Sequence, residues 1–200
     1  MKAGTTGLFL DRDGTINVER GYSSDPDSIE LIPGSAEAIR KANEAGLKVF
    51  IVTNQSGVAR GFYREEDVVA MNKRLLDVLR EAGARIDAVY YCPHHPDTGT
   101  PPYRIVCSCR KPKTGMLQQA GNEYGIDLAS SFVVGDKCTD VQTGRNAGCK
   151  SVLVLTGYGA AELERCKTTG PPDHVAEDLL GAWNYIRDIL TQRARLSHQS

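Results

Sequence analysis

Close to its start the chain reads Leu8-Phe9-Leu10-Asp11-Arg12-Asp13-Gly14-Thr15, an apolar stretch that runs directly into an acidic turn. The apolar residues predict a short buried β-strand, and Gly14 is typical of the turn that ends such a strand. Because side chains at positions i and i+2 of an extended chain point the same way, Asp11 and Asp13 place two carboxylates side by side. A bound cation or a shared proton would relieve their repulsion.

Strand-like and helix-like stretches alternate along the rest of the chain. Apolar runs predict strands over 8–10, 48–53, 86–91, 131–135, 151–155 and 174–176. Helical spacing of apolar residues predicts helices over 34–45, 65–81, 114–124, 140–147 and 178–190. This order indicates an α/β fold, a doubly wound three-layer sandwich whose mainly parallel sheet is covered on both faces. We expect one domain over 1–191 and a disordered polar tail over 192–200.

The polar residues that interrupt the apolar pattern stand where predicted strands end. Asp11 and Asp13 follow the first strand, Thr53 and Asn54 the second, and Asp136 the fourth. Parallel sheets bind ligands beyond the carboxyl ends of their strands. A solvent-exposed turn would account for a single Asp-x-Asp-Gly sequence. It would not account for acidic residues that follow two separate strands. Carboxylate oxygens from several strands suit Mg²⁺, so the sequence predicts a magnesium site at this edge.

Cysteine and histidine gather in a loop over residues 92–110. The candidate ligands are Cys92, His94, Cys107 and Cys109, with His95 as a rival to His94. Three thiols and one imidazole suit a closed tetrahedral site for structural Zn²⁺. Because Cys109 is followed directly by Arg110 and Lys111, bound zinc would fix both cations in place.

Composition excludes several classes of protein. The chain has 200 residues, a net charge of −1 and 24% charged residues, which is ordinary for a soluble globular protein. It lacks the basic excess expected of a nucleic-acid-binding protein, and it has no run long enough to cross a membrane. We expect a cytoplasmic protein, in which the remaining thiols, Cys138, Cys149 and Cys166, are reduced.

Four stretches resemble the motifs of the haloacid dehalogenase superfamily in the family's order. Residues 9–15 resemble motif I, Val52-Thr53-Asn54 motif II, Lys111 motif III, and Gly135-Asp136 with Asp140 motif IV. The resemblance implies a magnesium-dependent phosphatase that forms a phosphorylated aspartate. An acid at the position of Asp13 fits an alcohol leaving group, whereas dehalogenases and phosphonatases of the superfamily lack one. Receiver domains, which also phosphorylate an aspartate, do not share motifs II to IV.

The resemblance also implies a role for each matching residue. Asp11 would be the nucleophile and Asp13 the general acid and base. Thr53 and Lys111 would hold the transferring phosphoryl group. Mg²⁺ would bind the Asp11 carboxylate, the Asp13 backbone carbonyl and Asp136, with Asp140 behind them.

Only about twenty residues separate the first strand from the first helix, so no cap domain fits there. Two subfamilies combine a capless domain with a zinc loop: D,D-heptose 1,7-bisphosphate 7-phosphatases and histidinol-phosphate phosphatases. Residues 11–17, 53–61, 90–96 and 109–112 resemble the heptose enzymes more closely.

That resemblance implies a small sugar bisphosphate as substrate. Because an open site without a cap needs no second subunit, we expect a monomer. The implied substrate-binding residues are Glu19, Arg20, Gly21, Tyr22, Thr53, Asn54, Gln55, Ser56, Arg110, Lys111 and Lys137. Three alternatives stay open: a histidinol-phosphate phosphatase, a phosphatase of broad specificity for small phosphate esters, and a zinc-stabilised binding protein without activity.

Overall fold

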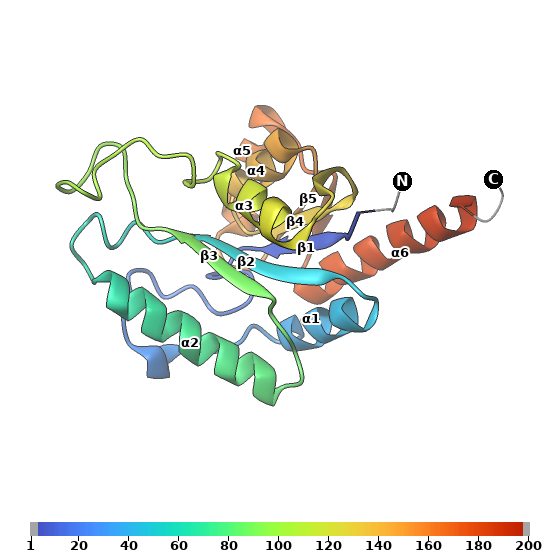
Figure 1. Cartoon of the computed structure of the whole chain (residues 1–200), viewed down its shortest axis with the longest axis horizontal. Coiled ribbons are helices and arrows are strands. Elements are labelled where there is room, and N and C mark those ends of the chain that lie inside the picture. The colour runs from blue at the N-terminus through green and yellow to red at the C-terminus, as the bar shows by residue number, and fades with distance from the viewer. Residues whose placement is uncertain (1–3, 198–200) are drawn as a thin grey trace.

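Six apolar stretches pair side by side as one parallel sheet in the computed structural model, which describes residues 4–197 (Figure 1). The strands are β1 (Gly7–Leu10), β2 (Lys48–Asn54), β3 (Ala88–Cys92), β4 (Phe132–Gly135), β5 (Lys150–Val154) and β6 (His174–Ala176). Their order across the sheet is β3-β2-β1-β4-β5-β6, and each neighbouring pair is parallel. The order reverses between β1 and β4, so the carboxyl ends of these two strands flank a crevice suited to a ligand.

Six helices cover the two faces of the sheet. They are α1 (Ser35–Glu44), α2 (Glu65–Glu81), α3 (Gly115–Tyr124), α4 (Cys138–Ala147), α5 (Gly159–Thr169) and α6 (Leu179–Ser197). Helices α1, α2 and α6 pack on one face, and α3, α4 and α5 lie on the other (Figure 1). The predicted doubly wound α/β sandwich is confirmed.

The strands are apolar without interruption because both sides of the sheet are covered. In β1, Leu8 and Leu10 pack with α1 and α6, whereas Phe9 faces the opposite layer and stacks on Phe50 with ring centroids 5.1 Å apart. None of these side chains is more than 2% exposed. The core therefore holds the carboxyl end of β1, and the acidic turn that follows it, in a fixed place.

Helix α5 (Gly159–Thr169) is absent from the sequence-based prediction. Its sequence is mostly polar, and only Leu163 and Cys166 reach the small cluster around Val141 and Leu153. That apolar stripe is too narrow to reveal a helix by periodicity. Helix α4 also begins at Cys138, two residues before the expected start.

Cys138 and Cys166 form a disulfide between α4 and α5, which corrects the expectation that both are reduced thiols. The two helices pack side by side and bring the Cα atoms to 5.2 Å, a separation suited to a disulfide. The cysteines are 28 residues apart with no diagnostic spacing, so the pairing arises from the tertiary fold. Cys149 is a free, buried thiol.

Helix α6 continues to Ser197, which corrects the expected disordered tail over 192–200; residues 198–200 lie outside the described chain. Arg193 explains the extension. Its Nη1 donates a hydrogen bond of 2.7 Å to the Ser130 carbonyl, and its guanidinium lies 5.3 Å from the centroid of the Phe132 ring. These contacts tie the last turns of α6 to the start of β4.

Between residues 4 and 197 the chain has no separate cap domain. The segment from β1 to α1 holds only turns and the short 3₁₀ helix Pro26–Ser28, and the segment from β3 to α3 is the cysteine-containing loop. None of the helices in this part of the chain has the length and apolar character of a membrane span.

We predict that Arg193→Ala lowers the free energy of unfolding by about 1–2 kcal/mol, because it removes a hydrogen bond and a cation–π contact. The exposed Arg195 in the same turn region is the matched control, and Arg195→Ala should change stability by less than about 0.5 kcal/mol. Urea denaturation of both variants measures the difference. Equal stabilities would contradict an anchoring role for Arg193.

Candidate active site

Lys111 is the central cation of the strand-end cluster. Its Nζ lies 2.9 Å from Asp11 Oδ1 and 2.5 Å from Asp140 Oδ1, and it donates a 2.8 Å hydrogen bond to the Val52 carbonyl. The residue is only 4% exposed. Burial alone would lower its pKa, but the charges of Asp11 and Asp140 outweigh burial and hold the pKa above the usual lysine value.

Three buried carboxylates gather here, and two of them, Asp11 and Asp140, pair with Lys111. Asp11, Asp136 and Asp140 each place one oxygen within 4.8 Å of the others. Burial, followed by the charge of Asp11, raises the pKa of Asp136 to about 7, and burial raises the pKa of Asp140 to about 6. Among the described residues Asp136 Oδ1 has no hydrogen-bond partner, and Lys137 Nζ is 3.8 Å away. An unpartnered buried oxygen within an acidic cluster fits a divalent cation.

The backbone approaches Asp136 so closely that two glycines are required. At Gly14 (φ +81°) and Gly157 (φ +57°), a Cβ atom would lie 2.2 and 2.3 Å from Asp136 Oδ2. The backbone N–H of Tyr158 donates a 2.9 Å hydrogen bond to the same oxygen, and Thr156 Oγ1 donates to the Gly14 carbonyl. The loop after β5 therefore closes on the acidic turn and orients Asp136.

Asp13 is not a member of this acidic cluster, and its carboxylate accepts hydrogen bonds from a different set of side chains. Arg12 Nη2 lies 2.8 Å from Asp13 Oδ2, Asn17 Nδ2 donates to Oδ1 at 3.0 Å, and Gln55 Nε2 donates to Oδ2 at 3.0 Å. Burial opposes ionisation of Asp13, but the Arg12 charge and these hydrogen bonds keep its pKa below the usual value. Arg12 is itself held by Asn72 of α2 at 2.8 Å.

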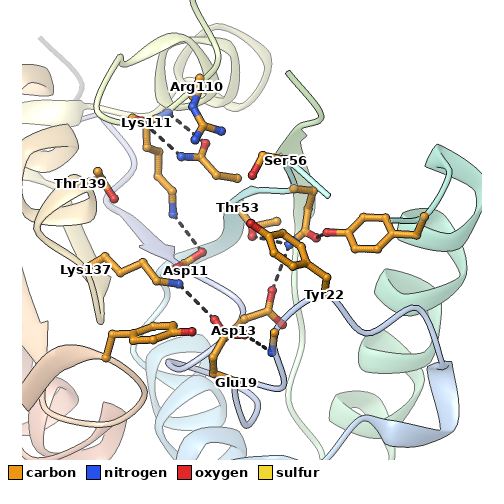
Figure 2. A pocket seen from close by; sticks show the side chains of 15 residues that line it. Asp11, Asp13, Glu19, Tyr22, Thr53, Ser56, Arg110, Lys111, Lys137 and Thr139 are labelled. Atoms are coloured by element: carbon orange, nitrogen blue, oxygen red, sulfur yellow. Dashed lines mark hydrogen bonds and ion pairs between the residues drawn. The ribbon is translucent and has the colours of Figure 1, made fainter. Parts of the chain in front are cut away.

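A cavity of about 390 Å³ opens above these groups (Figure 2). Its lining includes all but one of the residues predicted to bind substrate: Glu19, Gly21, Tyr22, Thr53, Asn54, Gln55, Ser56, Arg110, Lys111 and Lys137. Asp11 and Asp13 also face it. Sequences from β1, β2, β4 and the cysteine-containing loop thus meet at one edge of the sheet.

Arg20 is the exception among the predicted substrate-binding residues. Its guanidinium is paired with Glu30, and the residue is absent from the cavity lining. The neighbouring Glu19 does face the cavity, where its Oε2 lies 3.2 Å from Lys137 Nζ.

The cavity has three further lining residues that the sequence analysis did not identify: Tyr63, Thr139 and Tyr158. Tyr158 lies beyond the carboxyl end of β5, in a turn whose sequence carries none of the four motifs. Its ring lies 4.8 Å from Lys137 Nζ. Tyr63 precedes α2 and carries no motif, so no local signal would have revealed it.

The cysteine-containing loop brings its four candidate ligands together. Sγ of Cys107 is 3.5 Å from that of Cys92 and 3.3 Å from that of Cys109, and His94 Nδ1 is 3.5 Å from Cys109 Sγ. Edges of about 3.8 Å are expected around tetrahedral zinc with Zn–S bonds of about 2.3 Å. The donors therefore fit Zn²⁺, and His94 rather than His95 completes the set.

This cluster also fixes the two cations that follow it. Arg110 Nη1 donates a 3.0 Å hydrogen bond to the His94 carbonyl. Asn54 clamps Lys111 from the other side, because its amide exchanges hydrogen bonds of 3.0 and 3.2 Å with the Lys111 backbone. Loop and sheet together set the positions of Arg110 and Lys111 at the cavity.

Known proteins match this chain over most of its length. The HAD-hydrolase-like family matches residues 108–182. D-glycero-D-manno-heptose-1,7-bisphosphate 7-phosphatase from Thermosynechococcus vestitus is 44% identical over 93% of this chain and 97% of the relative. D-glycero-beta-D-manno-heptose-1,7-bisphosphate 7-phosphatase from Escherichia coli K12 is 43% identical over 78% of this chain and 83% of its own length.

A solved structure extends the similarity to the fold. The D,D-heptose 1,7-bisphosphate phosphatase from B. bronchiseptica, crystallised with magnesium and phosphate, has a TM-score of 0.79 and 35% identity, and the match covers 92% of this chain and 99% of that one. The chain is therefore similar to this enzyme in sequence as well as in fold. The chain belongs to the heptose-1,7-bisphosphate 7-phosphatase family of the haloacid dehalogenase superfamily.

Proposed function

We propose that this chain removes the phosphate from C7 of D-glycero-D-manno-heptose 1,7-bisphosphate by way of an aspartyl-phosphate. The observation that carries the proposal is the placement of Asp11, 2.9 Å from the buried Lys111 and beside Asp136, at the floor of a cavity in a chain of this family. A buried carboxylate between a fixed cation and a cation-binding acid is suited to attack an anionic phosphate.

In the first step, Asp11 attacks phosphorus and the bond from phosphorus to the C7 oxygen breaks. Asp13 gives its proton to the departing alkoxide, so the sugar leaves as an alcohol. Lys111 and Thr53 stabilise the charge on the transferring phosphoryl oxygens. Asp13 must be protonated when this step begins, although its contacts with Arg12 favour the carboxylate.

In the second step, water attacks the phosphorus of the aspartyl-phosphate, and Asp13, now a carboxylate, accepts the proton of that water. Phosphate departs and Asp11 is restored. The donors around Asp13 suit this step, because they stabilise the carboxylate that acts as the base.

Asp11, Asp136 and the backbone carbonyl of Asp13 are the groups we expect to hold Mg²⁺, with Asp140 behind them. Bound Mg²⁺ supplies positive charge that offsets the repulsion between the Asp11 carboxylate and the substrate phosphate. The similar enzyme from B. bronchiseptica was crystallised with magnesium and phosphate, which supports this choice of metal.

Arg110 is the residue we propose to hold the second phosphate of the substrate. It lines the cavity beside Lys111, and its guanidinium can bind a phosphate through two parallel hydrogen bonds. Glu19, Tyr22, Ser56 and Lys137 surround the remaining space and are the proposed contacts for the sugar.

We further infer that Cys92, His94, Cys107 and Cys109 hold a structural zinc ion. We propose a single-domain enzyme that works as a monomer in the cytoplasm on a free sugar phosphate. One chain lines the whole cavity, which supports a monomer. The Cys92, Cys107 and Cys109 thiols are free to bind zinc, in a chain that also holds the Cys138–Cys166 disulfide.

Asp11→Asn should abolish turnover, with a fall in kcat of at least about a thousandfold, because the amide cannot form the covalent intermediate. Acid-quenched enzyme after exposure to ³²P-labelled substrate should carry label in the unaltered protein and none in the variant. A circular dichroism spectrum unchanged from that of the unaltered protein is the control for folding. Undiminished hydrolysis by the variant would refute Asp11 as the nucleophile and would favour a different site.

Arg110→Ala should raise KM for the 1,7-bisphosphate about tenfold or more, because a charge-assisted phosphate contact is lost. Heptose 7-phosphate, which lacks the second phosphate, is the matched control and should be hydrolysed almost equally by both proteins. Histidinol phosphate completes the panel. Near-equal kcat/KM for histidinol phosphate and the bisphosphate in the unaltered enzyme would contradict the heptose assignment and favour a phosphatase of broader specificity.

Cys107→Ser should remove bound zinc and lower kcat about tenfold or more, because Arg110 and Lys111 lose the loop that fixes them. Cys149→Ser, at a buried thiol outside the cluster, should retain zinc and near-normal activity. Metal content by mass spectrometry and steady-state rates, both measured on the same samples, show whether loss of zinc lowers activity. A zinc-free Cys107→Ser enzyme with full activity would exclude the proposed link between the loop and the cations.

A further inference from the structure

Tyr63 lines the cavity and is hydrogen-bonded to one other residue of its lining, Gln55. It stands in the loop between β2 and α2, and its hydroxyl donates a 2.8 Å hydrogen bond to Gln55 Oε1. Burial raises the pKa of Tyr63 to about 12, so the hydroxyl remains a donor at neutral pH. Gln55 is 3% exposed, and its amide has little freedom to turn.

The other end of the same amide reaches two groups assigned to the reaction. Gln55 Nε2 donates to Asp13 Oδ2 at 3.0 Å and to Thr53 Oγ1 at 2.9 Å. A carboxylate only accepts hydrogen bonds, so the nitrogen of the amide must face Asp13 and the oxygen must face away. The Tyr63 hydroxyl occupies that oxygen and thereby favours this orientation of the amide.

The position of the Tyr63 ring is fixed by the backbone beside it. A Cβ atom at Gly57 would lie 2.2 Å from Tyr63 Cζ, so the ring packs directly on the glycine backbone. The ring of Tyr22 lies 6.5 Å away, measured between ring centroids. Two hydrogen bonds, from Tyr63 to Gln55 and from Gln55 to Asp13, therefore link the fixed ring to the Asp13 carboxyl group.

We propose that Tyr63 is a positioning residue that, through Gln55, directs the Asp13 carboxyl group for proton transfer to the departing alcohol. Arg12 and Asn17 bind the same carboxyl group, and Gln55 is the contact that joins it to the loop after β2. The inference rests on the proposed function, in which Asp13 is the general acid.

The test compares two leaving groups. The C7 alkoxide of the heptose bisphosphate needs a proton in order to leave, whereas the nitrophenolate of p-nitrophenyl phosphate leaves without one. The parameter kcat/KM covers all steps through loss of the alcohol, so it reports this proton transfer. Tyr63→Phe removes only the hydroxyl and should lower kcat/KM about tenfold for the bisphosphate and less than about twofold for the aryl ester.

Tyr90→Phe is the matched control. It removes a phenol that donates to Glu123 at 2.6 Å, outside the cavity, and should leave both rates unchanged. A loss in Tyr63→Phe that is equal for both substrates would reduce Tyr63 to a structural role and overturn the inference, as would no loss for either.

Asp13→Asn, assayed in parallel, separates the inference from the function on which it rests. A large loss for the bisphosphate and a small one for the aryl ester supports Asp13 as the acid. If Asp13→Asn shows this pattern and Tyr63→Phe does not, only the role of Tyr63 is wrong. If Asp13→Asn shows no dependence on the leaving group, the assignment of Asp13 itself fails.

Discussion

The buried ion cluster of Lys111 with Asp11 and Asp140 is the constraint on which the site depends. A lysine that is almost fully buried would be costly as an isolated charge, and the two carboxylates compensate for that cost. Its three partners come from the turn directly after β1, the start of α4 and the backbone of β2. The cluster therefore joins both halves of the sheet at the point where the strand order reverses, and it lies at the place where we propose that phosphate binds.

The second constraint is that Lys111 comes from a loop and not from a strand. Loops of this length lack a core and position side chains loosely unless something else holds them. Here the four-donor cluster of the loop, the contact of Arg110 with the His94 carbonyl and the clamp from Asn54 supply that support. The position of Lys111 at the site thus depends on the structure of the loop.

Much of the fold and the centre of the site could be predicted from the sequence because they depend on local patterns. Uninterrupted apolar strands imply a sheet covered on both faces, and the acids that follow them must meet at one edge of a parallel sheet. The features that the sequence did not predict depend on contacts between distant segments of the chain. Helix α5 has only a narrow apolar stripe, the pairing of Cys138 with Cys166 has no spacing signature, and Tyr63 matters only because Gln55 is folded beneath it. Arg20 was predicted to bind substrate but does not line the cavity, because its position beside Glu19 in the sequence does not determine where its side chain points.

The lack of a cap domain between residues 4 and 197 has a consequence for the timing of turnover. In enzymes with a moving lid, closure shields the chemistry and reopening governs product release. In the proposed two-step reaction, no large element among residues 4–197 would have to move before water reaches the phosphorylated aspartate or before free phosphate leaves. Exclusion of water from Asp11 during the first step would then fall to the bound sugar itself, which would fill the cavity until its C7 oxygen departs.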